Sequence, residues 1–325
     1  MNNVLIIGCG EIGSRHLQGL SKSNIDIKIT ICDPNENSIA ISKDRFSEMP
    51  TNPKIKSLTY LRSINELTEN FDIAIIATTS KKRKILIKNL LDKIKIKYFV
   101  IEKIAFQSID DFEFILKLFK REKIKAWVNC PNRAFNSYRR IKKMGLSKSN
   151  LFLSVDGGNW GLASNLIHYI DLFSFLTSDN HLEIGAHNLD NKIYRSKRQG
   201  FIELSGSITA RTKKGDYLIV NSEKNSTRPI ILELCYENLR VIISESESKA
   251  KLQTQKKKWL WENIDFEITN QSSMTNNLLY QIIKTDSCNL TKLEESYQLH
   301  KIIIKSFNKH ISSIKGKKID ICPIT

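Results

Sequence analysis

The sequence predicts an α/β fold in which a doubly wound parallel sheet is followed by an α+β domain with an open, mainly antiparallel sheet. Three observations predict it. The first half alternates short apolar runs with helical periodicity, the pattern of a parallel sheet. A glycine-rich turn joins the first apolar run to the first helix. The second half changes to runs of alternating apolar and polar residues, which are typical of an antiparallel sheet.

The glycine-rich turn follows the apolar run 4–7 and reads Gly8-Cys9-Gly10-Glu11-Ile12-Gly13. A helix begins near Glu11, a β-rich run covers 27–32, and Asp33 follows that run. Strand, glycine turn, helix, strand and acid, with the acid about twenty residues after the last glycine, form a dinucleotide-binding fingerprint. The first half is therefore predicted to be a Rossmann domain.

Each part of this fingerprint has a physical role. Gly8 allows the tight turn, Gly10 lets a pyrophosphate approach the backbone, and Gly13 lets the helix pack closely on the sheet. The start of the helix points free N–H groups at the phosphates. Asp33 is predicted to accept hydrogen bonds from ribose hydroxyls and to repel a 2′-phosphate, so NAD(H) is favoured over NADP(H).

The remaining elements of the first half follow the same alternation. Helices are predicted at 38–46, 84–94 and 110–121, the last capped by Ser108, and strands at 72–77, 98–101 and 124–128. The strand at 72–77 ends at Thr78-Thr79-Ser80, and the strand at 98–101 ends at Glu102-Lys103. A dinucleotide-binding domain is therefore expected over residues 1–128.

The second domain is expected over residues 129–325. A helix is predicted at 160–177, and strands at 151–155, 201–212, 217–220, 230–236, 239–244 and 259–268, with a hairpin turn at 213–216. Two helices follow at 274–284 and 290–310, the second capped by Thr291 with Glu294 in a capping box. Whether the helix at 290–310 packs back on the first domain stays open. The active site is expected between the domains.

Composition narrows the class of protein. The net charge of +17 comes mostly from lysines spread along the chain, and the runs 81–84 and 256–258 are short. Such runs are typical of a solvated surface, so no nucleic-acid partner is expected. The six cysteines are scattered without a CxxC pair, no apolar run could span a bilayer, and no signal peptide is visible. A cytoplasmic protein without metal or membrane partner is predicted.

Further motifs extend the fingerprint. They are Gly13-Ser14-Arg15-His16, Ala77-Thr78-Thr79, Glu102-Lys103-Ile104, the stretch 132–140, the helix 164–171 with His168 and Asp171, and the C-terminal stretch 290–300. Together they resemble the glucose–fructose oxidoreductase / inositol dehydrogenase / MocA (Gfo/Idh/MocA) family over nearly the whole chain. The resemblance implies hydride transfer with NAD(H) at a carbinol or carbonyl carbon of a sugar, cyclic polyol or sugar nucleotide.

Three residues depart from the family pattern. Ile104 replaces a proline, Ser164 replaces an aspartate and Leu166 replaces a glycine. Ile104 argues against a cis peptide, which is essentially a proline feature. Of the lysine, aspartate and histidine that act together in family members, Lys103 and His168 remain.

These two residues are the predicted catalytic groups. An imidazole at His168 titrates near neutral pH and can exchange the hydroxyl proton. An ammonium at Lys103 can stabilise alkoxide charge, or exchange the proton itself. A packed helix histidine and a solvated strand-end lysine are the plainer interpretations. The predicted cofactor-binding residues are Gly8, Gly10, Glu11, Ile12, Gly13, Asp33, Thr78, Thr79 and Glu102.

Four residues are predicted to bind substrate: Arg133, Trp160, Asn165 and Asp171. Arg133 could hold an anionic group, with a hinge salt bridge as the alternative. Asp171, one helical turn after His168, could orient the imidazole, or could be a surface carboxylate. Trp160 and Asn165 could line a sugar pocket, or Trp160 could simply pack in the core.

The predicted function is an NAD(H)-dependent oxidoreductase of carbohydrate metabolism, with a place in surface-polysaccharide or acidic-sugar biosynthesis. A homodimer or homotetramer is expected, because an open sheet with one uncovered face is a ready interface. Two alternatives stay open: a catalytically silent dinucleotide-binding sensor or scaffold, and an imine or enone reductase of the same fold.

Overall fold

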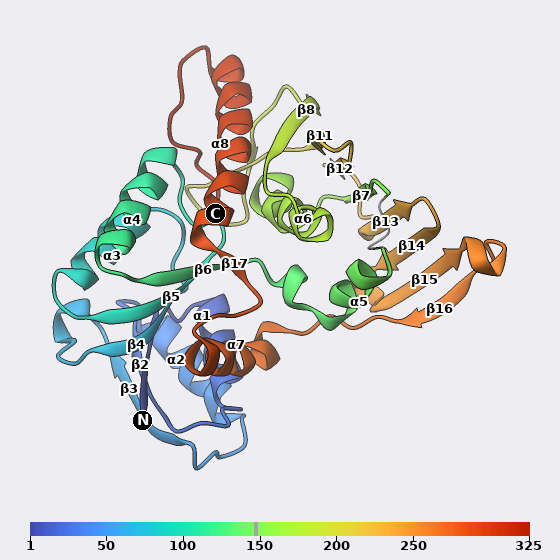
Figure 1. Cartoon of the computed structure of the whole chain (residues 1–325). Coiled ribbons are helices and arrows are strands. Elements are labelled where there is room, and N and C mark those ends of the chain that lie inside the picture. Colours follow the sequence, from blue (N-terminus) through green and yellow to red (C-terminus); the bar gives the residue numbers. More distant parts are fainter. Residues whose placement is uncertain (146–148) are drawn as a thin grey trace. The chain divides into compact units, whose positions relative to one another are not determined.

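A computed structural model describes residues 1–145 and 149–325, and the chain forms two compact units (Figure 1). Unit 1 contains residues 1–106, 110–129 and 269–293. Unit 2 contains residues 107–109, 130–268 and 294–325. Each unit is built around a sheet of its own.

Unit 1 is built on seven strands in the order β17-β6-β5-β4-β1-β2-β3. Its strands are β1 Asn2–Ile7, β2 Ile27–Cys32, β3 Ile55–Leu61, β4 Phe71–Ile76, β5 Ile96–Glu102, β6 Lys125–Asn129 and β17 Thr291–Lys292. Its helices are α1 Glu11–Leu20, α2 Glu36–Ser47, α3 Arg83–Leu91, α4 Ile109–Arg121 and α7 Gln271–Thr285, with a short 3₁₀ turn at Ile64–Glu66.

The sheet of unit 1 is doubly wound. The first six strands pair in parallel, and the chain runs outward from β1 to β3 before it returns to β4 beside β1. Helices α1, α2 and α7 lie on one face, and α3 and α4 lie on the other (Figure 1). Because both faces are covered, β1, β4 and β5 are almost continuously buried and apolar. The predicted Rossmann sheet is confirmed.

The segment 269–293 lies with unit 1, although the sequence placed it with the second domain. Helix α7 packs on α1 so closely that a Cβ on Gly19 would lie 2.8 Å from the Cβ of Thr275. Strand β17 pairs antiparallel with β6, with Thr291 opposite Val128. The prediction of Thr291 as a helix cap is wrong, because its backbone is engaged in this ladder and α8 begins only at Leu293.

Several elements were not predicted. Strand β3 is an edge strand that pairs only with β2, and its residues are mostly half-buried or exposed. An edge strand needs no continuous apolar run, so its sequence gives a weak signal. Helix α5 Asn136–Met144 and strands β8 Leu182–Leu189 and β15 Lys249–Thr254 were also missed. Their burial patterns mix exposed and buried positions.

Unit 2 has an eight-stranded sheet in the order β16-β15-β14-β13-β7-β12-β11-β8. Its other strands are β7 Phe152–Gly158, β11 Gly206–Thr212, β12 Tyr217–Glu223, β13 Ile231–Tyr236, β14 Leu239–Ser244 and β16 Glu262–Asp265. Among the described strands of this eight-stranded sheet, only the β7–β12 pair is parallel, which confirms the mainly antiparallel sheet. Two short strands, β9 Tyr194–Arg195 and β10 Ile202–Glu203, pair separately.

Two long helices belong to unit 2. Helix α6 Leu162–Thr177 packs on the β12 strand of the sheet and is buried over most of its length. Helix α8 Leu293–Lys315 belongs to unit 2 apart from its first residue. The short 3₁₀ helices cover Pro131–Ala134, Glu245–Glu247 and Gln255–Lys257.

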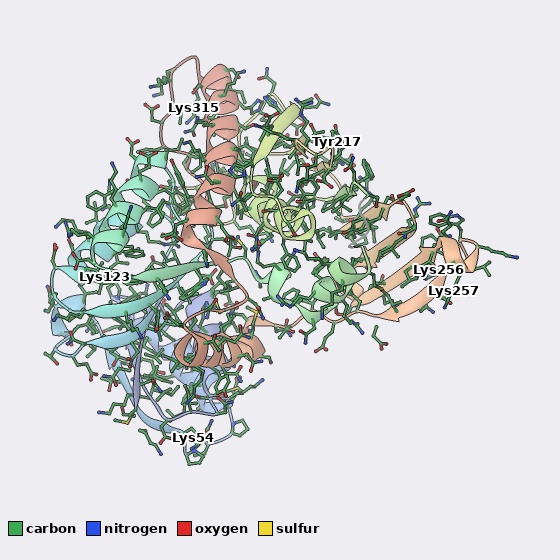
Figure 2. All side chains as sticks on the ribbon, in the orientation of Figure 1. Lys54, Lys123, Tyr217, Lys256, Lys257 and Lys315 are labelled. Atoms are coloured by element: carbon green, nitrogen blue, oxygen red, sulfur yellow. The ribbon has the colours of Figure 1, made fainter. Side chains whose placement is uncertain are left out.

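Figure 2 shows that Lys54 and Lys123 lie apart in unit 1, and that in unit 2 Lys315 lies apart from the neighbouring Lys256 and Lys257. In unit 1, Lys54 precedes β3 and Lys123 follows α4. In unit 2, Lys256 and Lys257 lie at the connection between β15 and β16, whereas Lys315 ends α8. These positive charges are therefore dispersed over several elements. None of the described helices is long and apolar enough to cross a bilayer.

Candidate functional site

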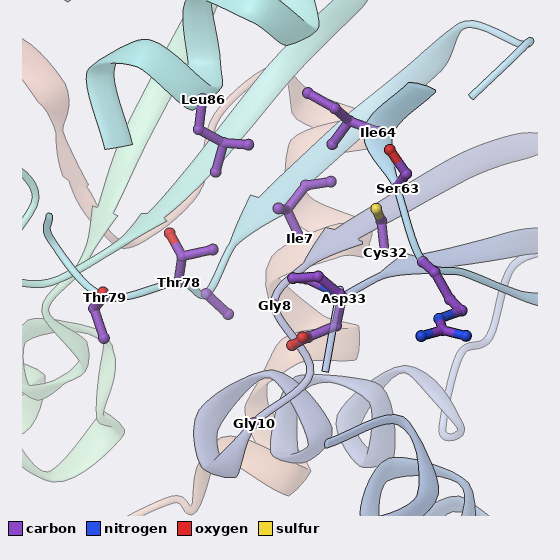
Figure 3. A pocket seen from close by; sticks show the side chains of 13 residues that line it. Ile7, Gly8, Gly10, Cys32, Asp33, Ser63, Ile64, Thr78, Thr79 and Leu86 are labelled. Atoms are coloured by element: carbon purple, nitrogen blue, oxygen red, sulfur yellow. The ribbon is translucent and has the colours of Figure 1, made fainter. Parts of the chain in front are cut away.

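A pocket of about 550 Å³ opens in unit 1 at the carboxyl ends of β1, β2 and β4 (Figure 3). The strand order reverses between β1 and β4, and such switch points are where α/β sheets bind ligands. The pocket is lined by Ile7, Gly8, Gly10, Cys32, Asp33, Pro34, Arg62, Ser63, Ile64, Ala77, Thr78, Thr79 and Leu86. It therefore brings together five of the predicted cofactor residues: Gly8, Gly10, Asp33, Thr78 and Thr79.

The three glycines occupy different environments. Gly8 has a φ of +87°, and a Cβ there would lie 3.0 Å from the backbone nitrogen of Thr78. A Cβ on Gly13 would lie 1.9 Å from the carbonyl oxygen of Gly8, so only glycine lets α1 pack against this turn. A Cβ on Gly10 would meet nothing within 4 Å. The loop is thus tight behind the pocket and open towards it.

The start of α1 is suited to an anion. Gly10 is the N-cap and provides no side-chain cap, so the first-turn N–H groups remain available to a ligand. The Glu11 carboxylate turns to Arg45, with a 2.7 Å contact, and that hydrogen bond lowers the pKa of Glu11. Neither the Glu11 nor the Ile12 side chain lines the pocket.

Asp33 ties the second strand to the glycine loop. Its carboxylate accepts hydrogen bonds from the backbone N–H groups of Cys9 and Asn35, both at 2.8 Å. Carboxylate oxygens have further lone pairs, so Asp33 can still accept from ligand hydroxyls. Burial and the neighbouring Asp33 charge raise the pKa of Cys9 to about 12, so this thiol stays neutral.

Two features of the pocket had not been predicted. Arg62 and Ser63 line it from the turn after β3, and Arg62 pairs with Glu36 at 2.6 Å. The capping box formed by Ser63 and Glu66 was visible in the sequence and could have indicated this turn. The buried Oγ1 of Thr78 has no hydrogen-bond partner within the described part of the chain. An orphaned hydroxyl on the pocket wall fits a polar ligand.

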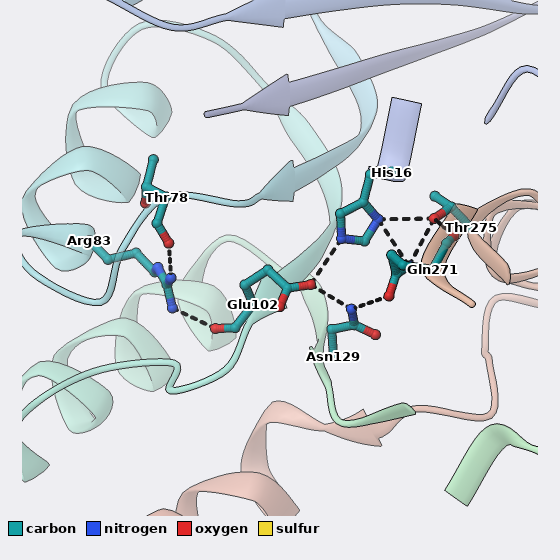
Figure 4. A network of polar contacts seen from close by, with 7 residues as sticks. All are labelled: His16, Thr78, Arg83, Glu102, Asn129, Gln271 and Thr275. Carbon is teal, nitrogen blue, oxygen red and sulfur yellow. Dashed lines mark hydrogen bonds and ion pairs between the residues drawn. The ribbon is translucent and has the colours of Figure 1, made fainter. Parts of the chain in front are cut away.

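Glu102 does not reach this pocket. Its carboxylate accepts hydrogen bonds from the His16 imidazole at 2.9 Å and from Asn129, which also binds Gln271 (Figure 4). The other imidazole nitrogen of His16 lies 3.0 Å from the Thr275 hydroxyl. Burial opposes ionisation of Glu102, but the hydrogen bond and charge of His16 outweigh it and lower its pKa. Glu102 is a buried ionised hub of unit 1.

Lys103 follows Glu102 at the carboxyl end of β5 and is half-buried. The peptide bond between Lys103 and Ile104 is cis, contrary to the expectation from the isoleucine. The Ile104 side chain is buried in unit 1, and its carbonyl accepts a hydrogen bond from Arg83 at 2.7 Å. The cis bond therefore occurs without a proline, at a buried isoleucine whose carbonyl is hydrogen-bonded.

The run 81–84 is not the uniform solvated surface that was predicted. Arg83 is 1% exposed, whereas Lys81 and Lys82 are exposed. Its guanidinium binds carbonyls on two loops that follow β4 and β5. The single arginine among lysines was the available signal, because a planar fork suits several acceptors better than an ammonium does.

In unit 2, two predicted substrate residues bind each other. Arg133 Nε and Nη2 donate to the two carboxylate oxygens of Asp171, at 2.7 and 3.0 Å. Asp171 is fully buried, so it is not the surface carboxylate of the plainer interpretation. Glu295 lies 3.7 Å from the Arg133 guanidinium on another side. This bidentate pair holds the 3₁₀ turn before α5 to α6.

His168 lies half-buried on α6, one turn after Ser164. The hydroxyl of Ser164 donates to Glu203 Oε2 at 2.7 Å, and the other Glu203 oxygen accepts from the Ala163 backbone N–H. A carboxylate from β10 therefore stands beside the position where the family pattern has an aspartate. Nothing in the local sequence around Glu203 indicated this contact.

A second pocket, of about 540 Å³, lies in unit 2 and includes Trp160. Its lining is rich in amides and hydroxyls: Gly158, Asn159, Trp160, Lys224, Asn225, Ser226, Thr227, Arg228, Pro229, Ile230, Glu245 and Ser246. Glu245 accepts hydrogen bonds from the hydroxyls of Tyr138 and Tyr169, and burial raises its pKa. Asn165, also predicted here, donates to the Trp160 carbonyl at 2.8 Å instead of lining the pocket.

Side-chain clusters that could bind a metal ion are absent from the described residues. In residues 1–145 and 149–325, no group of three or more His, Cys, Asp or Glu side chains could hold an ion. The six cysteines are free thiols.

Comparisons with known proteins agree with this geometry. The family described as "Oxidoreductase family, NAD-binding Rossmann fold" (GFO_IDH_MocA) matches residues 2–130. A search of curated proteins gave no match.

Solved structures match over nearly the full chain. UDP-N-acetylglucosamine 3-dehydrogenase GnnA from Acidithiobacillus ferrooxidans has a TM-score of 0.71 at 11% identity, covering 94% of this chain and 96% of its own. An oxidoreductase from Agrobacterium radiobacter, in complex with NAD⁺, L-tartaric acid and magnesium, has a TM-score of 0.73 at 14% identity, covering 98% of each chain. A super-repressor mutant of Gal80p from Saccharomyces cerevisiae has a TM-score of 0.71 at 14% identity, covering 98% of this chain and 97% of its own.

These structural matches show the shared fold. Residues 2–130 match the family that the sequence motifs resemble, the Gfo/Idh/MocA oxidoreductases with an NAD-binding Rossmann fold.

Proposed function

We propose that this protein is an NAD(H)-dependent oxidoreductase that transfers a hydride to or from a carbinol or carbonyl carbon of a sugar, cyclic polyol or sugar nucleotide. The observation that carries the proposal is the pocket at the strand switch point, with its open Gly10 and orphaned Thr78 hydroxyl. These features fit a dinucleotide. Bound NAD(H) would supply the hydride acceptor or donor.

The residues of unit 1 would hold the cofactor in a defined way. The N–H groups at the start of α1 would bind the pyrophosphate beside Gly10. Asp33 would accept hydrogen bonds from the adenosine ribose, and the Thr78 hydroxyl would gain the partner that it lacks.

Lys103 and His168 would be the polar catalytic groups. The Lys103 ammonium would stabilise negative charge on the substrate oxygen, and the His168 imidazole would exchange its proton. The Glu203–Ser164 contact supports retained chemistry, because it keeps a carboxylate next to the His168 helix face. Proton transfer at the carbinol oxygen would then accompany hydride transfer at carbon.

The substrate class follows from unit 2 and from one structural neighbour. The pocket around Trp160 offers an aromatic surface, several amides and the Glu245 carboxyl, which suit the hydroxyls and apolar faces of a sugar. GnnA is named for action on UDP-N-acetylglucosamine. We therefore favour a sugar nucleotide, in surface-polysaccharide or acidic-sugar biosynthesis in the cytoplasm.

The direct test is a turnover screen with NAD⁺ and sugar nucleotides, beginning with UDP-N-acetylglucosamine, that follows NADH formation. Reduction of NAD⁺ by at least one sugar nucleotide, and not by the free nucleotide, is the expected result. NADH binding is measured beforehand by energy transfer from tryptophan. Absence of NADH binding would overturn the proposal.

Cofactor choice provides a separate prediction. Replacing Asp33 with serine is expected to weaken NADH binding about tenfold. It should also reduce the preference for NADH over NADPH, because the carboxylate that repels a 2′-phosphate is gone. Titrations of both cofactors measure the effect. Asp190→Ser is a control, since Asp190 lies in unit 2 and lines another pocket. Equal NADH and NADPH affinities in the unaltered protein would contradict the role of Asp33.

The alternative is a dinucleotide-binding sensor or scaffold without turnover. The similarity to a Gal80p super-repressor is the observation that favours it. NADH binding without reduction of any sugar nucleotide would favour the sensor.

We also propose a homodimer or homotetramer, because the apolar side chains of Phe152, Tyr217 and Ile231 are exposed on the unit 2 sheet. A light-scattering measurement that shows a monomer would exclude this oligomer.

A further inference from the structure

The buried guanidinium of Arg83 is outside the roles described so far. Arg83 is the first residue of α3 and is 1% exposed, between an exposed Lys82 and a half-buried Lys84. Full burial of an arginine requires its N–H groups to be satisfied. The acceptors of its Nη1 and Nη2 groups indicate what the side chain does.

The guanidinium joins two loops of unit 1 at the carboxyl edge of the sheet (Figure 4). Nη2 donates to the Thr78 carbonyl in the loop after β4. Nη1 lies 2.5, 2.7 and 2.8 Å from the carbonyl oxygens of Glu102, Ile104 and Ala105 in the loop after β5. Two of these acceptors, Glu102 and Ile104, directly flank Lys103.

Local preferences do not explain an arginine at this position. A cation in the first turn of a helix opposes the helix dipole. The residue before it, Lys82, has a φ of 61°, in the left-handed region that residues other than glycine rarely adopt. Such departures from local preferences are expected where a residue makes contacts that the tertiary structure requires. Here those contacts are the hydrogen bonds from Arg83 to four backbone carbonyls.

Thr78 is fixed from two directions. Its backbone nitrogen lies where a Cβ on Gly8 would approach to 3.0 Å, and its carbonyl binds Arg83. Thr78 also lines the cofactor pocket. We propose that Arg83 is a positioning residue that holds this pocket wall and the Lys103 loop in one fixed arrangement. The inference rests on the proposed function for the chemical role of Lys103.

A lysine could not take this place. Its ammonium is a single donor centre on a flexible stem, whereas the planar fork of arginine reaches both loops at once. Arg83→Lys therefore keeps the charge and loses the link, and Arg83→Met loses both. Lys84→Met is the matched control, because Lys84 is the next residue and pairs with Asp111 at 2.5 Å instead of binding the two loops.

The experiment uses the full chain and two readouts that do not need turnover. The first is the rate of acetylation of Lys103 by a soluble reagent, followed by peptide mass and divided by the rate at Lys97. Lys97 is an internal reference, since it lies exposed near the other end of β5. The second readout is the Kd of NADH. Thermal unfolding establishes that each variant is folded.

In both Arg83 variants the ratio of Lys103 to Lys97 acetylation is expected to change several-fold, and the Kd of NADH to rise about tenfold, as for one lost charge-assisted hydrogen bond. Lys84→Met should match the unaltered protein. An unchanged acetylation ratio in a folded variant would overturn the inference. Failure of both variants to unfold cooperatively would also overturn it, because Arg83 would then be needed for folding alone. If the unaltered protein binds no NADH, the proposed function fails, but the acetylation ratio still decides the role of Arg83.

Discussion

Replacing Lys103 with methionine is expected to lower kcat by a factor of about 10² to 10³, the usual range for loss of a donor that stabilises developing negative charge on the substrate oxygen. The NADH affinity should stay nearly unchanged, because the pocket of unit 1 is built from Gly8, Gly10, Asp33 and Thr78 rather than from the Lys103 side chain. The measurement is steady-state turnover of the best sugar nucleotide, with NADH titration alongside.

Replacing His168 with asparagine should cause a loss of similar size. If the two groups act as a unit on the substrate oxygen, the double variant should be little slower than either single variant, since the effects of residues that act as a unit are not additive. Two controls match them: Lys97→Met on β5, the strand that Lys103 follows, and His181→Asn, whose side chain is 80% exposed in unit 2. Equal turnover in the His168 variant would remove it from the mechanism.

Replacing Glu102 with alanine is expected to cost about 3 kcal/mol of unfolding free energy, because it leaves the buried His16 and Asn129 donors without their acceptor. Glu102→Gln should cost less, since its amide oxygen can still accept. Urea unfolding at about pH 7 measures both. Glu122→Ala is the control, as Glu122 pairs with Arg121 at 2.8 Å on an exposed turn.

The same residue gives a pH dependence of definite sign. Its pKa in the folded protein lies below the ordinary value of 4.5, so the folded state favours the ionised carboxylate. The stabilisation by Glu102 is therefore complete above about pH 4.5 and is lost as the pH falls through the folded pKa. Near pH 4 and below, the difference between the unaltered protein and Glu102→Ala should shrink. A difference that grows on acidification would contradict an ionised Glu102.

Much of unit 1 follows from the sequence. The glycine turn, Asp33 and the buried strands β1, β4 and β5 are local signals, because parallel strands covered on both faces need continuous apolar runs. The pocket then forms where β1, β2 and β4 end. Strand β3 was missed because an edge strand pairs on one side only, and with it the contribution of Arg62 and Ser63 to the pocket.

Other features depend on contacts between residues far apart in the chain. The sequence alone indicated the family resemblance, the Rossmann sheet and the candidate residues for holding a dinucleotide. Only the tertiary structure decided that Arg133 binds Asp171, that Glu203 meets Ser164, and that Arg83 is buried. The physical reason is that a polar side chain has no preferred partner in its own sequence. Burial removes water, and the nearest donor or acceptor that the fold supplies then takes its place.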